Sequence, residues 1–434
     1  MKIRHHFISS LLLIYLLTAC RSDDLEHDHR IQLSLEHITS SEQDVTYEGP
    51  NLSDNGTEII LRGTLFNQPA IFLSQLIDTS WTPLQAIITP STPINNSNAK
   101  FISFSKNITS HGSINYNGPM VYQGTIVFAA ELDNLKNGVF YSIQKQGEWI
   151  TNAIMQTGDI IENNKVINLD APYINKNKVY FLTSLKTEDE KTIYTIFTFD
   201  IPSQTLNMVL TSNNNDISQY WDMSLNKINF AIRGESQTTH AQNIYLHEQS
   251  NVLKSVYSTL YLPPGTNRYT FGGPSYFSDN KQEYVVNLVR FYDVLTSKYT
   301  ALYSNIFPNF LWVATHDTIM DPQTNNIKDK IIDVGNPTLE INANKAWIAF
   351  QGTATKHKDR IGIYASSVNL HTIASLTSRA PIFPVIEPDD ILQGIGTVSQ
   401  IFLGSVSLRQ QKITVATQLH TGEYEILLFH IANI

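Results

Sequence analysis

The sequence predicts an all-β fold, and specifically a β-propeller of seven blades. Three observations lead to this prediction. Beyond residue 30, no stretch keeps the three- and four-residue apolar spacing of an amphipathic helix. Short β-branched and aromatic runs are instead separated by Asn, Gly, Asp and Pro, which is typical of strands and turns. A strand–hairpin–strand pattern also recurs at nearly even spacing along the chain.

The repeat is clearest between residues 171 and 210. A turn containing Ala171 and Pro172 leads to a short strand, and the apolar strand 179–183 follows. A charged hairpin then leads to a strand rich in Tyr and Phe at 193–199, and a fourth strand at 206–210 closes the unit. A four-stranded antiparallel unit of this kind is the blade of a propeller.

The apolar second strand of this unit occurs seven times, starting at residues 59, 126, 179, 228, 285, 347 and 413. The gaps between starts range from 49 to 67 residues, with a mean of 59. Seven such units account for residues 31–434, although six or eight blades, or a pair of unrelated β-sandwiches, would also fit the pattern. We expect the early strand 31–35 to complete the last blade beside the C-terminal strand, so that the ring closes non-covalently.

Most copies begin with a turn that contains Gly, Pro or Ser. These leading turns are Gly49-Pro50, Gly112-Ser113, Gly273-Pro274-Ser275, Asn336-Pro337 and Gly404-Ser405. The copy at Ser218–Asp222 lacks the Pro, and Val285-Val286-Asn287 lacks the aromatic residue. Together with the Val-Tyr-Phe-Leu strand, the turns resemble the degenerate repeats of bacterial periplasmic propellers of the TolB type. That resemblance implies blades around a central channel.

The N-terminus predicts export and a lipid anchor. Lys2 and Arg4 precede an apolar run at residues 7–17, which is too short to cross a bilayer as a helix. Leu17-Thr18-Ala19-Cys20 resembles the bacterial lipobox, which implies cleavage between Ala19 and Cys20 and diacylglycerol on Cys20. We therefore expect a signal peptide at 1–19, a lipidated tether at 20–30 and a propeller at 31–434. The alternatives to a lipoprotein signal are an ordinary cleaved signal peptide with a chance cysteine and an uncleaved membrane anchor.

The residue after the lipidated cysteine bears on the membrane that carries the protein. In Gram-negative lipoproteins an Asp at that position favours retention at the inner membrane, and this chain has Arg21 there. The resemblance therefore implies a protein anchored in the outer membrane, although Asp23 and Asp24 follow closely.

Charge and cysteine content exclude several classes of protein. The formal charge is -9, and removal of residues 1–19 with Lys2 and Arg4 makes it -11. No basic run stands out along the sequence, which argues against a nucleic-acid partner and against surface binding to anionic lipid. Cys20 is the single cysteine, so the chain can form no internal disulfide. With Cys20 lipidated, thiol catalysis and a cysteine-based zinc site are excluded as well.

Few residues offer chemistry, and we predict no catalytic residue, metal or cofactor. Phosphate-loop, dinucleotide, zinc-protease and serine-hydrolase motifs are absent from the sequence. Glu26-His27-Asp28-His29 resembles a metal-ligand cluster but falls on the expected tether. The acids and amides of the segment 321–333 lack the Gly and the spacing of a calcium loop. His316-Asp317 and His420-Thr421-Gly422-Glu423 fall in expected connections, where such pairs are usually surface groups.

Two functions fit these observations. The first is a lipid-anchored envelope module that binds a protein or a glycan through a broad acidic surface. The second is a glycan hydrolase or lyase whose carboxylates gather at the channel mouth from different blades. The positions of Glu, Asp, His and Arg around the propeller axis distinguish the two hypotheses.

Overall fold

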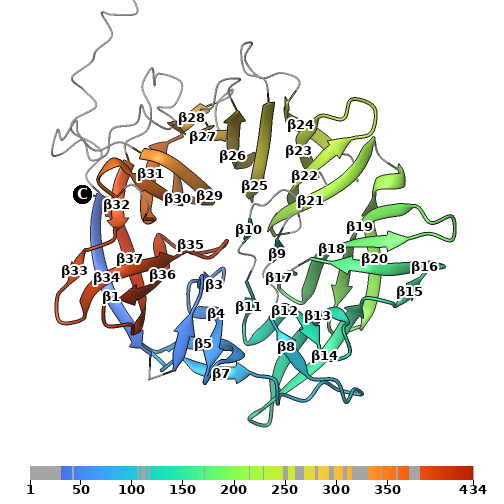
Figure 1. The fold of residues 1–434 in the computed structure, drawn as a ribbon, viewed down its shortest axis with the longest axis horizontal. Coiled ribbons are helices and arrows are strands. Elements are labelled where there is room, and N and C mark those ends of the chain that lie inside the picture. The colour runs from blue at the N-terminus through green and yellow to red at the C-terminus, as the bar shows by residue number, and fades with distance from the viewer. Residues whose placement is uncertain are drawn as a thin grey trace, which may run out of the picture.

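The computed structural model describes residues 31–433 except for 42–43, 105–106, 109–113, 116–117, 171, 215, 228, 248–252, 260–267, 279–281, 293–297, 306–309, 315–330, 343, 358–359 and 371–381. Seven antiparallel sheets form a ring (Figure 1), which confirms the predicted seven-bladed β-propeller. No helix among the described residues is both long enough and apolar enough to cross a membrane.

The blades follow one another along the chain. Blade 1 contains β2 (Val45–Tyr47), β3 (Asn51–Leu52), β4 (Glu58–Leu65), β5 (Gln68–Ile77), β6 (Ser80–Trp81) and β7 (Gln85–Ile88). Blade 2 contains β8 (Phe101–Ser103), β11 (Met120–Tyr122), β12 (Thr125–Leu132), β13 (Asn137–Lys145) and β14 (Glu148–Gln156). Blade 3 contains β15 (Ile160–Ile161), β16 (Asn164–Leu169), β17 (Tyr173–Asn175), β18 (Lys178–Lys186), β19 (Thr192–Asp200) and β20 (Thr205–Thr211).

The next three blades each have four strands. Blade 4 contains β21 (Ile217–Asn226), β22 (Asn229–Ser236), β23 (Gln242–His247) and β24 (Leu253–Ser258). Blade 5 contains β25 (Arg268–Ser278), β26 (Glu283–Tyr292), β27 (Lys298–Ser304) and β28 (Phe310–Ala314). Blade 6 contains β29 (Ile331–Asn342), β30 (Lys345–Ala354), β31 (Gly362–Asn369) and β32 (Ile382–Ile386). Blade 7 contains β33 (Ile391–Leu392), β34 (Gly396–Phe402), β35 (Leu408–Arg409), β36 (Lys412–Leu419) and β37 (Tyr424–Asn433), joined by β1 (Ile31–Ser40).

Four short elements of the described chain lie outside this pattern. The strands β9 (Asn107–Ile108) and β10 (Ile114–Asn115) pair with each other between β8 and β11. The 3-10 turns η2 (Ser212–Asn214) and η4 (Thr355–His357) lie in connections.

The ring closes through strand pairing between the two ends of the described chain. In blade 7 the strand order is β34, β36, β37 and β1, so the N-terminal strand supplies the outermost position. The two strands are antiparallel, with Ile31 opposite Asn433 and Ser40 opposite Glu425. The expected closure by the early strand is therefore confirmed, and it extends five residues beyond the predicted end at residue 35.

The Gly- and Pro-containing turns have a different place from the one the sequence predicts. They interrupt the first strand of a blade, because the segment before the turn pairs with the same second strand as the segment after it. In blade 1, for example, Tyr47 pairs with Gly63 and Asn51 with Ile60, so the first strand has one extra residue. In blade 5 the same kind of shift lies between Phe271 and Pro274. The turns are therefore β-bulges, where Pro and Gly are tolerated.

This bulge is a shared feature of the first strands. Equivalent register shifts lie between Leu169 and Tyr173 in blade 3, between Tyr220 and Asp222 in blade 4 and between Val334 and Pro337 in blade 6. Blade 7 has a longer interruption between Phe402 and Leu408. The predicted turn Gly112-Ser113 lies outside the described residues.

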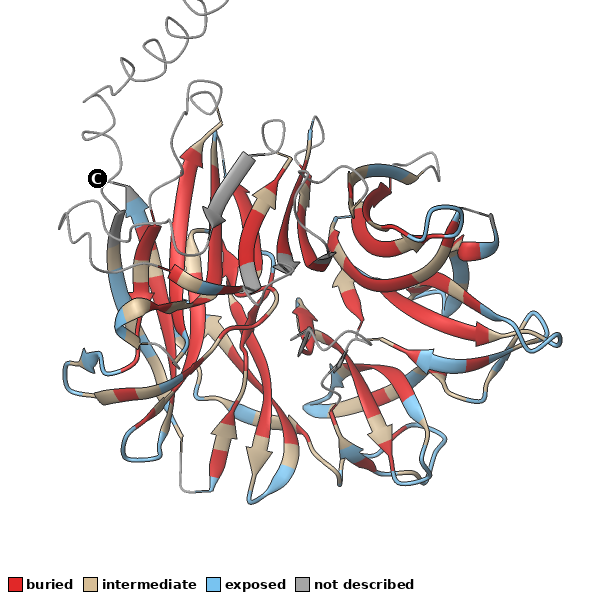
Figure 2. Ribbon diagram, turned by 45° about the horizontal axis from the view of Figure 1, so that its top comes forward, coloured by how far each residue is buried: buried red, intermediate tan, exposed pale blue. Residues whose placement is uncertain are grey.

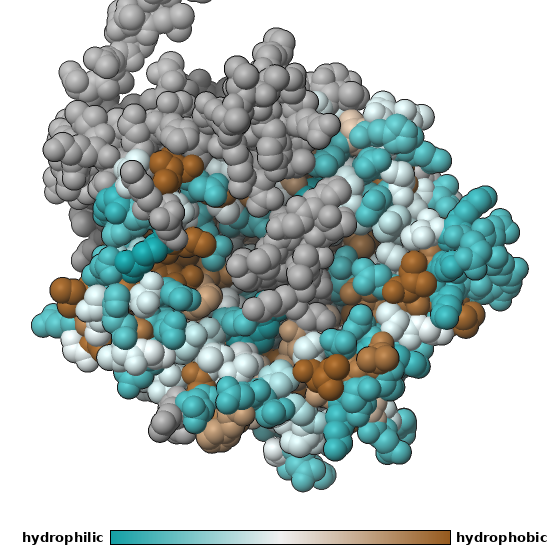
Figure 3. Space-filling model, in the orientation of Figure 1, coloured by the Kyte–Doolittle hydropathy of each residue, from teal (hydrophilic) through white to brown (hydrophobic). Residues whose placement is uncertain are grey.

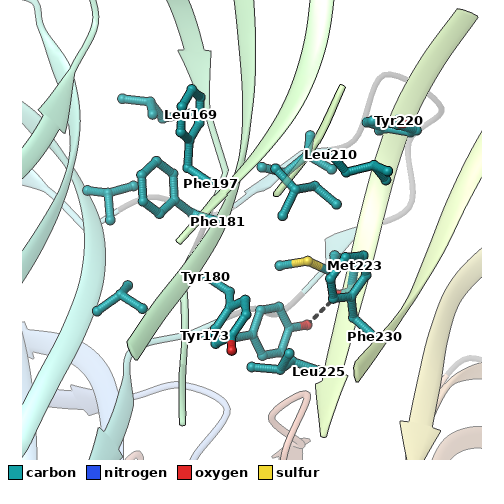
Figure 4. Close-up of a cluster of buried hydrophobic side chains, with 14 of the residues drawn as sticks. Leu169, Tyr173, Tyr180, Phe181, Phe197, Leu210, Tyr220, Met223, Leu225 and Phe230 are labelled. Atoms are coloured by element: carbon teal, nitrogen blue, oxygen red, sulfur yellow. Dashed lines mark hydrogen bonds between the residues drawn. The ribbon is translucent and has the colours of Figure 1, made fainter. Parts of the chain in front are cut away.

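The core lies between neighbouring blades. Six clusters of buried side chains together join all seven pairs of adjacent blades. Buried residues follow the middle of the strands, and exposed residues gather at the turns (Figure 2). In the cluster of Figure 4, Phe181 and Phe197 of blade 3 pack among residues that include Met223 and Phe230 of blade 4. The recurring Tyr and Phe are thus inter-blade core, and their burial is the main source of stability for the ring.

Two buried carboxylates also join blades at the turns between first and second strands. Glu58 of blade 1 accepts hydrogen bonds from the backbone N–H groups of Gln123 and Gly124 in blade 2, both at 2.9 Å. Glu340 of blade 6 accepts from Gln410 at 2.6 Å and from Gln411 at 2.9 Å in blade 7. Charge-assisted bonds of this kind are about twice as strong as neutral ones. They fix the turns of one blade against the next.

Candidate functional site

The antiparallel order of strands gives the propeller two distinct faces. Turns between second and third strands lie on the same face as the connections from one blade to the next, and we call this the upper face. Turns between first and second strands and between third and fourth strands lie on the opposite, lower face. Ile31 is paired with the end of β37 farthest from the β36–β37 turn. The chain therefore enters the ring from the lower face.

The upper face is acidic. Its described turns and connections carry twelve carboxylates and five lysine or arginine side chains. The carboxylates belong to Asp44, Asp133, Asp159, Glu162, Glu188, Asp189, Glu190, Asp216, Glu387, Asp389, Asp390 and Glu423. The cations are Lys100, Lys136, Lys191, Lys356 and Arg360. A face with this balance attracts cationic partners and is repelled by anionic ones.

The upper face also presents large apolar side chains at the tips of its turns. Phe66 is 65% exposed, Leu135 is 83% exposed and Ile391 is 82% exposed. Phe66 and Leu135 also have positive φ values of 50° and 64°, a backbone conformation that costs about 1–2 kcal/mol for residues with a Cβ. Turns of the lower face have the same conformation, at Gln123 and Gln146 for example, so apolar exposure and not backbone strain distinguishes the upper tips. These exposed tips are therefore the first candidates for contact with a partner.

An ion-pair cluster joins blades 6 and 7 on this face. Asp389 lies 2.7 Å from Nη1 of Arg360 and 3.2 Å from Nε2 of His420. The hydrogen bond from Arg360, with a smaller contribution from His420, lowers the pKa of Asp389. All three side chains are exposed, so the cluster contributes little to stability. His420 is thus a surface group, as expected from the sequence, and its neighbour Thr421 donates a hydrogen bond to Glu423.

A second polar cluster is built at the bulges of blades 3, 4 and 5. Asp222 of β21 forms an ion pair with Arg233 of β22, with 2.5 Å between Oδ2 and Nη2, and both side chains are 1% exposed. The guanidinium of Arg233 lies 5.2 Å from the ring centroid of Trp221 and donates through Nη1 to the carbonyl of Phe271 in blade 5. A buried pair of this kind costs several kcal/mol when one partner is removed.

Asp170 of blade 3 is the titratable neighbour of this pair. It lies in the interruption between β16 and β17, where its backbone N–H donates to the carbonyl of Leu182. Burial, with a smaller contribution from the charge of Asp222, raises the pKa of Asp170 to about 7. Asp170 can therefore hold or release a proton near neutral pH, which is the property of a general acid or base.

Several predicted site residues lie outside the described part of the chain. These are Cys20 with Ala19, the cluster at 26–29, the pair His316-Asp317 and residues 321–330. Asp333, at the end of that acidic stretch, accepts a hydrogen bond from the hydroxyl of Thr300 at 2.8 Å. Among the described residues, no group of three or more His, Cys, Asp or Glu side chains is arranged to hold a metal ion.

Sequence reasoning missed the Asp222–Arg233 pair and the acidic neighbour Asp170. The one available signal was the copy at Ser218–Asp222, which departs from the repeat by lacking Pro. That departure is where Asp222 lies, next to the bulge.

Comparisons with known proteins find only distant structural similarity. No protein-family model matches the sequence, and no curated protein matches it. The propeller domain of the Trilobed protease from Pyrococcus furiosus is similar over 90% of this chain and 98% of its own, with 10% identity and a TM-score of 0.44. A putative TolB from Agrobacterium tumefaciens is similar over 63% of this chain and 84% of its own, with 11% identity and a TM-score of 0.32. The WD40 domain of SCAP from fission yeast is similar over 91% of this chain and 98% of its own, with 10% identity and a TM-score of 0.35.

Proposed function

We propose that this chain is a lipid-anchored envelope protein whose propeller binds a protein partner through its upper face. The observation that carries the proposal is the combination of exposed apolar tips and excess carboxylates on that face. Aromatic and aliphatic anchors surrounded by charged groups are the usual composition of a protein-binding surface. In the face drawn in Figure 3, hydrophobic residues form separate small patches among hydrophilic ones.

The anchor part of the proposal rests on the lipobox. Lipidation at Cys20 and cleavage after Ala19 would hold the propeller at a membrane, and Arg21 favours the outer membrane of a Gram-negative bacterium. Metabolic labelling with a radioactive fatty acid tests this part. We expect label on the native chain and none on Cys20→Ser, and label on that variant would refute the lipid attachment.

Site-specific photocrosslinking in living cells tests the binding part. A photoreactive phenylalanine at position 66 or 135 should give a discrete protein adduct. The same residue at Met208, on the outer strand β20 of blade 3, serves as the matched control and should give none. Absence of adducts from both upper-face positions, or equal adducts from Met208, would contradict the proposal. An adduct that glycosidases rather than proteases remove would identify a glycan partner instead.

One observation favours the glycan-active enzyme as a second candidate. Asp170 has the pKa of a general acid, and a second carboxylate, Asp222, is close enough to influence it. Asp222 is held in its ion pair with Arg233, so Asp170 is the carboxyl group of the two that can exchange a proton near neutral pH. The enzyme hypothesis therefore predicts release of oligosaccharides from purified peptidoglycan by the native chain and a complete loss with Asp170→Asn.

A further inference from the structure

Exposed lysines gather on the lower face, although they are scattered along the sequence. Among the described residues at the turns and strand ends of that face, five lysines are exposed: Lys145, Lys176, Lys178, Lys227 and Lys254. They belong to the neighbouring blades 2, 3 and 4. The described acids at these turns and strand ends are Glu148, which is exposed, and Asp200, which is partly exposed and interacts with Lys178. Asp54 and Asp78, which are the other exposed acids among the described residues of this face, lie in blade 1.

The described chain also begins on the lower face, at β1 in blade 7. Cys20 is separated from β1 by the ten residues 21–30, which span at most about 35 Å when extended. Because β1 begins on the lower face of blade 7, a lipid on Cys20 would bring the membrane to that face. Blade 7 lies across the ring from blades 3 and 4 (Figure 1). The lipid and the lysines would therefore hold opposite edges of one face.

We propose that the lower face lies on an anionic phospholipid bilayer, with the lysines of blades 2, 3 and 4 against the headgroups. This inference rests on the proposed lipid anchor and deepens it. One or two acyl chains combined with a basic patch form a two-signal membrane attachment. The acidic upper face then points away from the bilayer, toward the partner. The sequence argues against surface binding to anionic lipid because it has no basic run. This inference departs from that expectation, because the topology brings together lysines that lie up to 109 positions apart.

Protection of lysines from a water-soluble acetylating reagent tests this inference. The full lipidated chain is inserted into phosphatidylcholine vesicles with and without phosphatidylglycerol, and each lysine is followed by mass spectrometry. In the anionic vesicles we expect the five lower-face lysines to react at least about threefold more slowly than in neutral vesicles. Lys100, Lys136 and Lys191 of the upper face are internal controls and should not change. High salt should remove the protection, since exposed charges are screened.

A pair of matched variants sharpens the test. Replacing Lys145, Lys176, Lys178, Lys227 and Lys254 by Gln should abolish the difference between the two kinds of vesicle. The difference is measured by chymotryptic accessibility of blade 3, whose Tyr and Phe cleavage sites the substitutions leave in place. Replacing Lys100, Lys136 and Lys191 by Gln should leave the difference intact. Equal reactivity of the two sets of lysines on anionic vesicles, with the protein still vesicle-bound, would overturn this inference and leave the anchor standing. Absence of fatty-acid label from the native chain would instead refute the anchor.

Discussion

The lower and upper faces of the propeller differ in how their turns are held. On the lower face, buried carboxylates bind turns of the next blade, as Glu58 does for Gln123 and Gly124. On the upper face, the turns carry exposed apolar residues such as Phe66 and Leu135. Positive φ values occur in turns of both faces and do not separate them. The comparison indicates that one face is fixed by inter-blade bonds and that the other face retains exposed apolar groups that contribute little to folding.

The buried pair between the two faces should show the largest effect on stability. Replacing Asp222 by Ala leaves the Arg233 guanidinium buried without its counter-ion, which should lower the free energy of unfolding by about 3–5 kcal/mol. Urea denaturation followed by tryptophan fluorescence measures the change. The control is Asp389→Ala in the exposed cluster, which should leave the free energy of unfolding nearly unchanged. Similar losses for both variants would contradict the distinction between buried and surface pairs.

Asp170 should make stability depend on pH in a defined window. Its folded pKa of about 7 lies above the unfolded value of 3.8, so the folded chain retains a proton that the unfolded chain has lost. The corresponding stability is present below about pH 4 and is lost as pH rises to about 7. Asp170→Asn removes this loss, so we expect the free energy of unfolding of this variant to exceed that of the native chain by about 4 kcal/mol at pH 8 and to match it near pH 4. Thermal unfolding across that range measures the difference, and parallel pH curves would refute the assignment.

Loss of a single inter-blade carboxylate of the lower face should lower the free energy of unfolding. Glu340→Ala leaves the backbone N–H groups of Gln410 and Gln411 without their acceptor, which should cost about 2–3 kcal/mol. Glu423→Ala on the exposed β36–β37 turn is the matched control and should cost less than about 0.5 kcal/mol. Chemical denaturation provides the measurement. A neutral Glu340→Ala would show that these bonds do not fix the lower face.

The strained tips of the upper face should show the smallest effect on stability and the opposite sign. Phe66→Asn places a residue that tolerates positive φ in the β4–β5 turn, which should raise the free energy of unfolding by about 0.5–1 kcal/mol. The same variant should weaken crosslinking from position 135 to the partner. Destabilisation by this substitution would show that Phe66 contributes to folding and would remove the argument from strain.

The sequence predicts the repeated strands well because each buried strand needs its own apolar run. The second and third strands of every blade, such as β18 and β19, are continuous apolar segments. The upper parts of the first strands were missed, since pieces such as β8 and β16 are short and carry exposed residues. The bulges were taken for turns because Gly and Pro favour both.

The functional surfaces depend on topology rather than on local sequence. The five lower-face lysines lie in three repeats at corresponding ends of strands, so no run of basic residues forms. Asp170, Asp222 and Arg233 come together only because neighbouring blades stack. Cys20 and the lipobox, by contrast, could be recognised in the sequence because the whole signal lies in consecutive residues. Their role stays a prediction.

The orientation of the propeller on the membrane is the most direct test of how the two faces divide their roles. Since Cys20 is the single cysteine and would carry the lipid, a fluorophore can be attached to one new cysteine, either Leu135→Cys or Gln146→Cys. These positions flank the nine-residue strand β13 in blade 2, which separates them by roughly 30 Å. Energy transfer to an acceptor in the bilayer surface should be strong from position 146 and weak from position 135. Equal transfer, or stronger transfer from position 135, would contradict the assignment of the lower face to the membrane and of the upper face to the partner.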